Sequence, residues 1–166
     1  SGCTSTALTT ASISLNQNWV GKYLVAKVTA TTATNKPGTE SAVTFSAGFG
    51  PIRIAPSNTA APSFSPTAVV VGRTITATVG TWSGTGPIST SYKWYSCQST
   101  ATISASIPVP STCSLISGFD NQSLVVPATI SGKKLLLAVT ATNSAGSTVA
   151  SAISGASVAA ASISPL

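Results

Sequence analysis

The side chains that could carry out acid–base chemistry are few in this sequence and lie far apart. The 166 residues include eight Lys or Arg, two Asp or Glu, and no His. General acid–base catalysis uses His, carboxylates, Lys or Tyr whose pKa values suit the reaction. The two acids, Glu40 and Asp120, belong to distant parts of the chain. We therefore expect these residues to contain no enzyme active site.

Metal and cofactor sites also lack the side chains that they require. A zinc site takes about four ligands from Cys, His, Asp and Glu, and a calcium site takes about six to eight oxygens, usually with several carboxylates. The three cysteines, Cys3, Cys97 and Cys113, cannot complete either set with two acids unless a partner chain contributes. The sequence therefore predicts no metal site and no cofactor.

The basic residues give a net charge of +6, but they are scattered along the chain. Lys133 and Lys134 are the only adjacent pair, and no aromatic-interleaved basic stripe indicates nucleic-acid binding. The longest apolar run, residues 135–139, is far shorter than the roughly 20 residues of a membrane span. We expect no nucleic-acid partner and no membrane span. Without a signal pattern or an initial Met, the chain is expected to be a mature product or an excised segment.

The elements that position these side chains are predicted to be β-strands. Apolar residues alternate with Ser and Thr in short runs, which Gly, Pro and Asn separate at intervals of about 8–12 residues, as in an all-β sandwich. Alternation along residues 91–97 places Tyr95 on the face opposite Trp94. A second strand, residues 135–142, presents one side that we expect to lie in the core: Leu135, Leu137 and Val139.

One segment of the sequence occurs twice. Residues 21–31, GKYLVAKVTAT, recur as residues 132–142, GKKLLLAVTAT. Upstream of these segments, Cys3 corresponds to Cys113 with a slip of one residue. The chain therefore holds two copies of one unit, and we expect the first copy to lack its beginning.

Further motifs in the second copy resemble a known family. They are GTWSG at residues 80–84, YKWYSC at residues 92–97 and VTATNSAG at residues 139–146. Together they resemble the tandem immunoglobulin-like repeats of secreted and cell-surface bacterial proteins, especially those of actinobacteria. The resemblance covers nearly all of residues 60–155 and, within residues 1–46, the latter half of a repeat.

The resemblance implies an all-β fold of tandem immunoglobulin-like Greek-key β-sandwiches, the first one incomplete within this chain. Residues 1–46 would form the C-terminal half of a sandwich, with strands about E–G, and residues 62–155 a complete one. Residues 47–61, a segment with flanking prolines, are expected to be a linker, and residues 156–166 a C-terminal tail or linker. Trp94 then corresponds to the buried Trp of strand C.

The cysteines indicate the cellular compartment. Cys97 and Cys113 lie in the same unit, and we expect a disulfide that closes a loop of about 15 residues. The alternative, a reactive thiol, requires basic or helix-terminal neighbours, which the sequence does not show. Disulfides persist in oxidising surroundings, so we expect an extracellular or cell-surface location. The odd cysteine, Cys3, indicates a free thiol, an intermolecular disulfide, or a partner upstream in a longer chain.

An incomplete first sandwich would leave a strand edge and apolar side chains in water. The side chains expected on the bare face are Ile13, Leu15, Leu24, Ala26 and Val28. Since burying such a side chain contributes about 1.5–3 kcal/mol, we expect another segment to cover this face, from a neighbouring repeat or from another subunit by self-association. Residues 156–166 are apolar enough to be donated in this way, although a linker is the simpler interpretation.

The segment between the paired cysteines, residues 98–112, is expected to protrude as a long loop. It is a candidate contact surface, although a variable loop without a role explains it equally. Tyr95 and Trp82 are candidate contacts to a glycan because aromatic faces bind sugar rings, whereas most aromatic side chains are structural.

These features predict a non-enzymatic structural or assembly module of an extracellular bacterial surface fibre or adhesin. In it, immunoglobulin-like repeats would be joined by strand and interface contacts. The first alternative is an adhesion module that binds a glycan or host protein through residues 98–112 and exposed aromatic side chains. The second alternative is an accessory immunoglobulin-like domain of a secreted enzyme or a phage particle.

Overall fold

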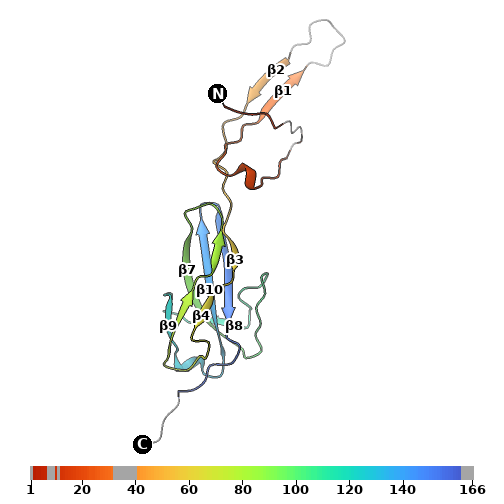
Figure 1. The fold of residues 1–166 in the computed structure, drawn as a ribbon. Helices are drawn as coiled ribbons and strands as arrows, with labels where there is room; N and C mark the ends of the chain where they lie inside the picture. Colours follow the sequence, from red (N-terminus) through yellow and green to blue (C-terminus); the bar gives the residue numbers. More distant parts are fainter. Residues whose placement is uncertain (1, 7–9, 11, 32–40, 162–166) are drawn as a thin grey trace, which may run out of the picture. The chain divides into compact units, whose positions relative to one another are not determined.

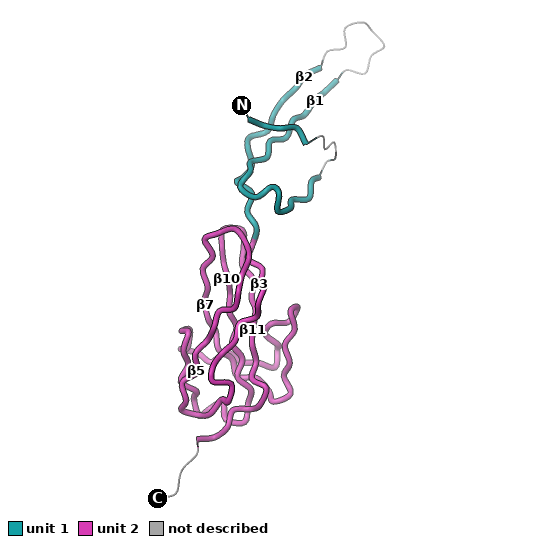
Figure 2. Tube along the Cα trace, viewed as in Figure 1, with its two compact units in different colours: residues 1–54 teal, residues 55–166 magenta. Residues whose placement is uncertain are grey.

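The computed structural model describes residues 2–6, 10, 12–31 and 41–161 of the chain. The chain divides into two compact units, unit 1 (residues 1–54) and unit 2 (residues 55–166) (Figure 2). The described residues form antiparallel β-sheets and short 3-10 helices, without an α-helix (Figure 1). The prediction of an all-β fold is therefore confirmed for this part of the chain. No helix within it is long and apolar enough to cross a membrane.

Unit 2 contains two main sheets and a smaller one. The first has four strands, in the order β11 (Gly146–Ile153), β10 (Lys134–Asn143), β7 (Ser89–Cys97) and β8 (Cys113–Leu115). The second has three strands, in the order β4 (Ser63–Ser65), β5 (Thr74–Thr78) and β9 (Ser123–Val125). The smallest sheet pairs β3 (Ser57–Ala60) with β6 (Thr81–Ser83). All of these strand pairs are antiparallel.

The core of unit 2 is built from side chains of both main sheets. Phe64, Ile75 and Leu124 come from the three-stranded sheet, one from each strand. Trp94 and Leu137 come from the four-stranded sheet and belong to the same buried cluster. Because side chains alternate along a strand, each sheet directs one face toward this cluster. The arrangement is consistent with a β-sandwich, in which two sheets pack face to face.

Strand β10 is buried on both faces, whereas the alternation pattern predicts only one core face. Leu137 faces the main cluster, and Leu136 and Ala138 belong to a second buried cluster. A strand covered on both faces needs a nearly continuous apolar run, and residues 135–139 are such a run. The cover on the second face comes from residues 98–112.

Residues 98–112 are largely exposed, as expected of a protruding loop, but a few of their apolar side chains anchor the segment on the sheet. Ala101 is buried, and Ile103 and Val109 pack against the second cluster. The segment folds back because its apolar side chains and those on the outer face of β10 would otherwise face water. Only the tip of the loop presents a large exposed apolar side chain, that of Ile107.

Unit 1 contains a β-hairpin, β1 (Lys27–Thr31) and β2 (Ser41–Phe45), preceded by the 3-10 helix η1 (Gln17–Trp19). Gly21 follows η1 with φ 77°. In unit 2 the helix η2 (Ala128–Ile130) is followed by Gly132, also with φ 77°. This left-handed conformation favours glycine. The two copies of the repeated sequence therefore enter their strands by the same backbone path.

Residues 12–16 do not form a strand, although about three strands are predicted within residues 1–46. The corresponding residues in unit 2 include β9, which pairs with β5. Among the described residues, no strand pairs with residues 12–16. A strand requires partners for its backbone N–H and C=O groups, so the same sequence pattern gives a strand in unit 2 only.

The linker predicted over residues 47–61 is divided between the two units. Phe49 forms an antiparallel bridge with Leu24, and the buried Ile52 donates its N–H to the Lys22 carbonyl at 2.9 Å. Residues 47–54 therefore belong to unit 1, whereas β3 makes the following residues part of unit 2.

The predicted C-terminal tail, residues 156–166, also packs in part against unit 2. Val158 is buried in the main cluster, and Ala159 forms a parallel bridge with Val70. The last residues of that prediction, 162–166, lie outside the described residues. Backbone hydrogen bonds also hold the segment, among them those from the Val158 N–H to the Lys133 carbonyl at 2.7 Å and from the Ala159 N–H to the Val69 carbonyl at 2.9 Å.

Candidate functional site

The predicted disulfide is present and joins neighbouring strands of unit 2. Cys97 and Cys113 are linked with an S–S distance of 2.06 Å, and they lie opposite each other in the pairing of β7 with β8. The bond closes the loop of residues 98–112 at its base. The Lys134 side chain donates a hydrogen bond to the Ala101 carbonyl at 3.1 Å, inside the loop.

The predicted core residues lie together. Trp94 is fully buried and donates its indole N–H to the Asn121 carbonyl at 3.0 Å. Its ring centroid lies 6.1 Å from that of Phe64, in a tilted arrangement. Around it lie three further fully buried side chains of the same cluster: Leu135, Leu137 and Val139.

The two aromatic residues predicted as ligand contacts are not brought together. Tyr95 is half-buried and packs against the second cluster, under the loop of residues 98–112. Trp82 packs against the main cluster and donates its indole N–H to the Val79 carbonyl at 2.9 Å. The two side chains therefore form no common platform for a sugar ring.

An exposed ion pair lies in unit 2. The Lys93 ammonium lies 2.8 Å from the Asp120 carboxylate. Such a surface pair contributes about 0–1 kcal/mol. The second acid considered as a catalytic candidate, Glu40, lies outside the described residues. Within the described residues, His, Cys, Asp and Glu form no group that could hold a metal ion.

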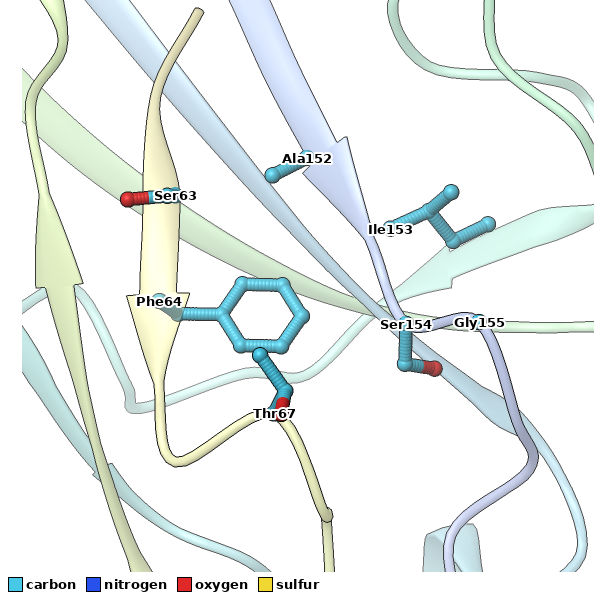
Figure 3. A pocket seen from close by; sticks show the side chains of 7 residues that line it. All are labelled: Ser63, Phe64, Thr67, Ala152, Ile153, Ser154 and Gly155. Atoms are coloured by element: carbon cyan, nitrogen blue, oxygen red, sulfur yellow. The ribbon is translucent and has the colours of Figure 1, made fainter.

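A small pocket lies between the end of β4 and the end of β11 (Figure 3). Its volume is about 150 Å³, below the roughly 300–1,000 Å³ typical of ligand pockets. The Ser154 hydroxyl in its wall accepts the Leu135 N–H at 3.0 Å and donates to the Ala156 carbonyl at 2.7 Å. This hydroxyl is therefore already paired within the protein.

The most unusual surface lies in unit 1, where large apolar side chains are exposed on both faces of the hairpin and in the segment before it. We call it the uncovered surface, and it consists of Ile13, Leu15, Val25, Val28, Val43 and Phe45. The other two residues predicted for the bare face differ in exposure, since Ala26 is exposed and Leu24 is half-buried. Isolated exposed apolar residues are ordinary, but a group of them marks an interaction site or an aggregation risk.

Comparison with unit 2 shows what this surface lacks. Val28 is 57% exposed, whereas Val139 at the corresponding repeat position is 0% exposed. On the other face, Val25 is 39% exposed and its counterpart Leu136 is 0% exposed. The same sequence positions therefore form two buried layers in unit 2 and two exposed layers in unit 1.

One edge of the hairpin is also open. Among the described residues, β1 pairs with β2 alone, whereas β10 pairs with β11 on one side and with β7 on the other. An open strand edge presents unpaired N–H and C=O groups and can template the addition of a strand. Cys3, in the same unit, is exposed and is a free cysteine.

The apolar side chains that β2 contributes to this surface were not predicted from the sequence. Val43 and Phe45 are exposed, and their alternation with Ala42 and Thr44 could have indicated a strand with an apolar face. The second apolar face of the hairpin, which carries Val43 and Phe45, was missed for the same reason as the second face of β10, because alternation assigns only one face to a core. No protein-family model matches the chain, and no curated protein matches it significantly.

Proposed function

We propose that the chain is a non-enzymatic assembly module of an extracellular bacterial surface fibre or adhesin. The observation that carries this proposal is the uncovered surface of unit 1, in which Val28 and Val25 are exposed although their counterparts in unit 2, Val139 and Leu136, are fully buried on opposite faces of β10. Neighbouring repeats or subunits cover this surface and so join one module to the next.

The immunoglobulin-like character of the repeats is part of the proposal. It is supported by the strand order of unit 2, in which β10 lies between β11 and β7, and β5 lies between β4 and β9. An immunoglobulin-type sandwich has F between G and C, and B between A and E, with a buried Trp on strand C. Trp94 on β7 fits that position.

An extracellular setting is supported by the disulfide. Cys97 and Cys113 are bonded, and disulfides of this kind persist where the surroundings are oxidising. The bond is compatible with a secreted or surface-attached protein.

The free energy gained by burying the apolar side chains of unit 1 must be compared with the cost of association. Full burial of a Val, Leu, Ile or Phe side chain contributes about 1.5–3 kcal/mol, and the uncovered surface has six such residues. Association costs an estimated 4–15 kcal/mol or more in lost freedom of motion. Burial of all six would contribute at most about 9–18 kcal/mol, which is of the same size as this cost, whereas burial of one or two side chains contributes at most about 6 kcal/mol.

The oligomeric state of the full chain tests this proposal. We expect sedimentation velocity to show concentration-dependent self-association of the wild type, and Val28→Lys to shift the chain toward monomer because it places a charge on the uncovered surface. Val125→Lys in unit 2 is the matched control, since Val125 is also a strand valine and is 54% exposed. A wild type that stays monomeric over the whole micromolar range would contradict self-association.

A binding function of the loop is the second candidate, favoured by one observation. Ile107 at the loop tip is 57% exposed, while Ala101, Ile103 and Val109 anchor the loop on the sheet. A glycan array probed with the wild type and with Ile107→Ser and Tyr95→Ala distinguishes this candidate. A glycan signal that both substitutions abolish would favour it over assembly.

A further inference from the structure

We infer that the open edge of β1 receives a β-strand with the sequence pattern of β7, supplied by another repeat unit of the same type. The inference rests on the proposed assembly function and specifies the partner that covers the uncovered surface. Main-chain hydrogen bonds of such an added strand give affinity, and its alternate side chains give specificity.

Unit 2 provides the template for this interaction. Residues 21–31 repeat residues 132–142 in sequence, and Gly21 and Gly132 have the same positive φ. Each glycine also donates its N–H to a carbonyl of the segment after its hairpin, at 2.9 Å: Gly21 to Ile52, and Gly132 to Val158. In unit 1, β1 and β2 therefore correspond to β10 and β11. The neighbour that β1 lacks corresponds to β7.

The pairing of β10 with β7 fixes the expected register. In unit 2, Val139 lies opposite Tyr92 and Leu137 lies opposite Trp94. The corresponding residues of unit 1 are Val28 and Ala26. An incoming strand of the β7 type thus places a Tyr beside Val28 and a Trp beside Ala26, on the face that the sandwich core occupies in unit 2.

The same register identifies one difference between β7 and the incoming strand. Ala138 lies opposite Lys93 in unit 2, but its counterpart in unit 1 is Lys27. Two lysines directly opposite each other on one face repel, whereas Lys opposite Glu attracts. The incoming strand therefore carries a neutral or acidic residue at the position of Lys93.

A synthetic peptide with the sequence of residues 87–98 tests the inference. The peptide carries Cys97→Ser, so that it cannot exchange disulfides, and a fluorophore for anisotropy titration against the full chain. We expect saturable binding to the wild type and to Val125→Lys, and binding about tenfold weaker to Val28→Lys. The peptide with Trp94→Ser should lose affinity to a similar degree, and equal binding by both peptides would overturn the inference.

A charge-swap cycle tests the register. The peptide with Lys93→Glu should bind the wild type up to about fivefold more tightly than the parent peptide. On the Lys27→Glu chain the preference should reverse, since the parent peptide then supplies the opposite charge. A preference that does not depend on residue 27 would overturn the proposed register.

Different results would overturn the proposed assembly function and the inferred β7-type strand. If the chain self-associates through Val28 but does not bind the peptide, a second copy of unit 1 covers the surface and the β7-type strand is overturned while assembly stands. If the peptide binds but the chain alone stays monomeric, the strand inference stands and self-association fails. If the chain neither self-associates nor binds the peptide, both are overturned. Hydrogen exchange of β1 and β2 in the dilute Val28→Lys chain that equals that of the dilute wild type confirms that unit 1 of the variant is folded as in the wild type.

Discussion

At the scale of single residues, unit 2 places its chemically distinctive side chains in structural roles. The indole of Trp94 is buried with its N–H bonded to a carbonyl, and that of Trp82 is bonded in the same manner. Buried donors that lack a partner are costly, and no polar side-chain atom buried in the described residues lacks one. These residues therefore stabilise the fold of unit 2.

The disulfide gives a prediction at this scale. Replacing both Cys97 and Cys113 by Ala should lower the free energy of unfolding by about 3 kcal/mol, since the unfolded chain regains the freedom of the closed loop. Denaturation in guanidinium chloride measures the change. Cys3→Ser serves as the control and should have no effect, because Cys3 is exposed and free. A double variant as stable as the wild type would contradict the prediction.

At the scale of elements, the turn between β5 and β6 requires a glycine at position 80. Gly80 has φ 76°, and a Cβ at this position would lie 2.9 Å from backbone atoms of Ala61 and Pro62 and still closer to the Ala60 carbonyl oxygen. The left-handed conformation and the close approach of another backbone segment both exclude other side chains.

Gly80→Ala should therefore destabilise unit 2 by at least about 2 kcal/mol. Thermal or chemical denaturation of the full chain measures the loss. Gly155→Ala is the matched control, since nothing lies within 4 Å of a Cβ built there and its φ is not in the left-handed region. Similar losses for the two variants would show that the close backbone contact at Gly80 is unimportant.

The loop of residues 98–112 provides a second prediction for an element. Val109 packs against the second cluster, whereas Ile107 is exposed. Val109→Ser should lower the free energy of unfolding by about 1 kcal/mol, and Ile107→Ser should change it by less than about 0.5 kcal/mol. Equal effects in chemical denaturation would indicate that the loop does not cover β10 in solution.

The elements also show which features the sequence could predict. Alternation identified the core face of β10, because this depends on a local pattern, and the resemblance to immunoglobulin-like repeats predicted the burial of Trp94. The second buried face and the folded-back loop were missed, since Leu136 is covered only when a segment distant in sequence docks on it. Residues 12–16 carry the pattern of β9 but lack its partner, and pairing between distant strands is not encoded in a local pattern.

At the scale of the whole molecule, the two units differ in how they are stabilised. Unit 2 has a large buried cluster drawn from two sheets, and a second one beneath its loop. In the described part of unit 1, Ile52 is the only buried apolar residue. A sheet of two strands is marginally stable by itself in water, so the stability of unit 1 depends on what covers it.

Hydrogen exchange of the full chain should reveal this difference. At low protein concentration, amides of β1 and β2 are expected to exchange much faster than those of β10, because few buried contacts oppose local opening. Higher concentration, or added β7-type peptide, should slow exchange in β1 selectively. Protection of β1 equal to that of β10 in dilute solution would contradict the incomplete character of unit 1.

The disulfide-closed loop has a consequence for engineering. Ser104 and Ile107 exchange backbone hydrogen bonds of 3.2 Å across the loop tip, and the base is held by the bond between Cys97 and Cys113. Because the loop ends are already fixed, doubling the loop length costs only about 0.6 kcal/mol in closure entropy. Unit 2 can therefore serve as a display scaffold that presents foreign peptide sequences between Ser104 and Ile107.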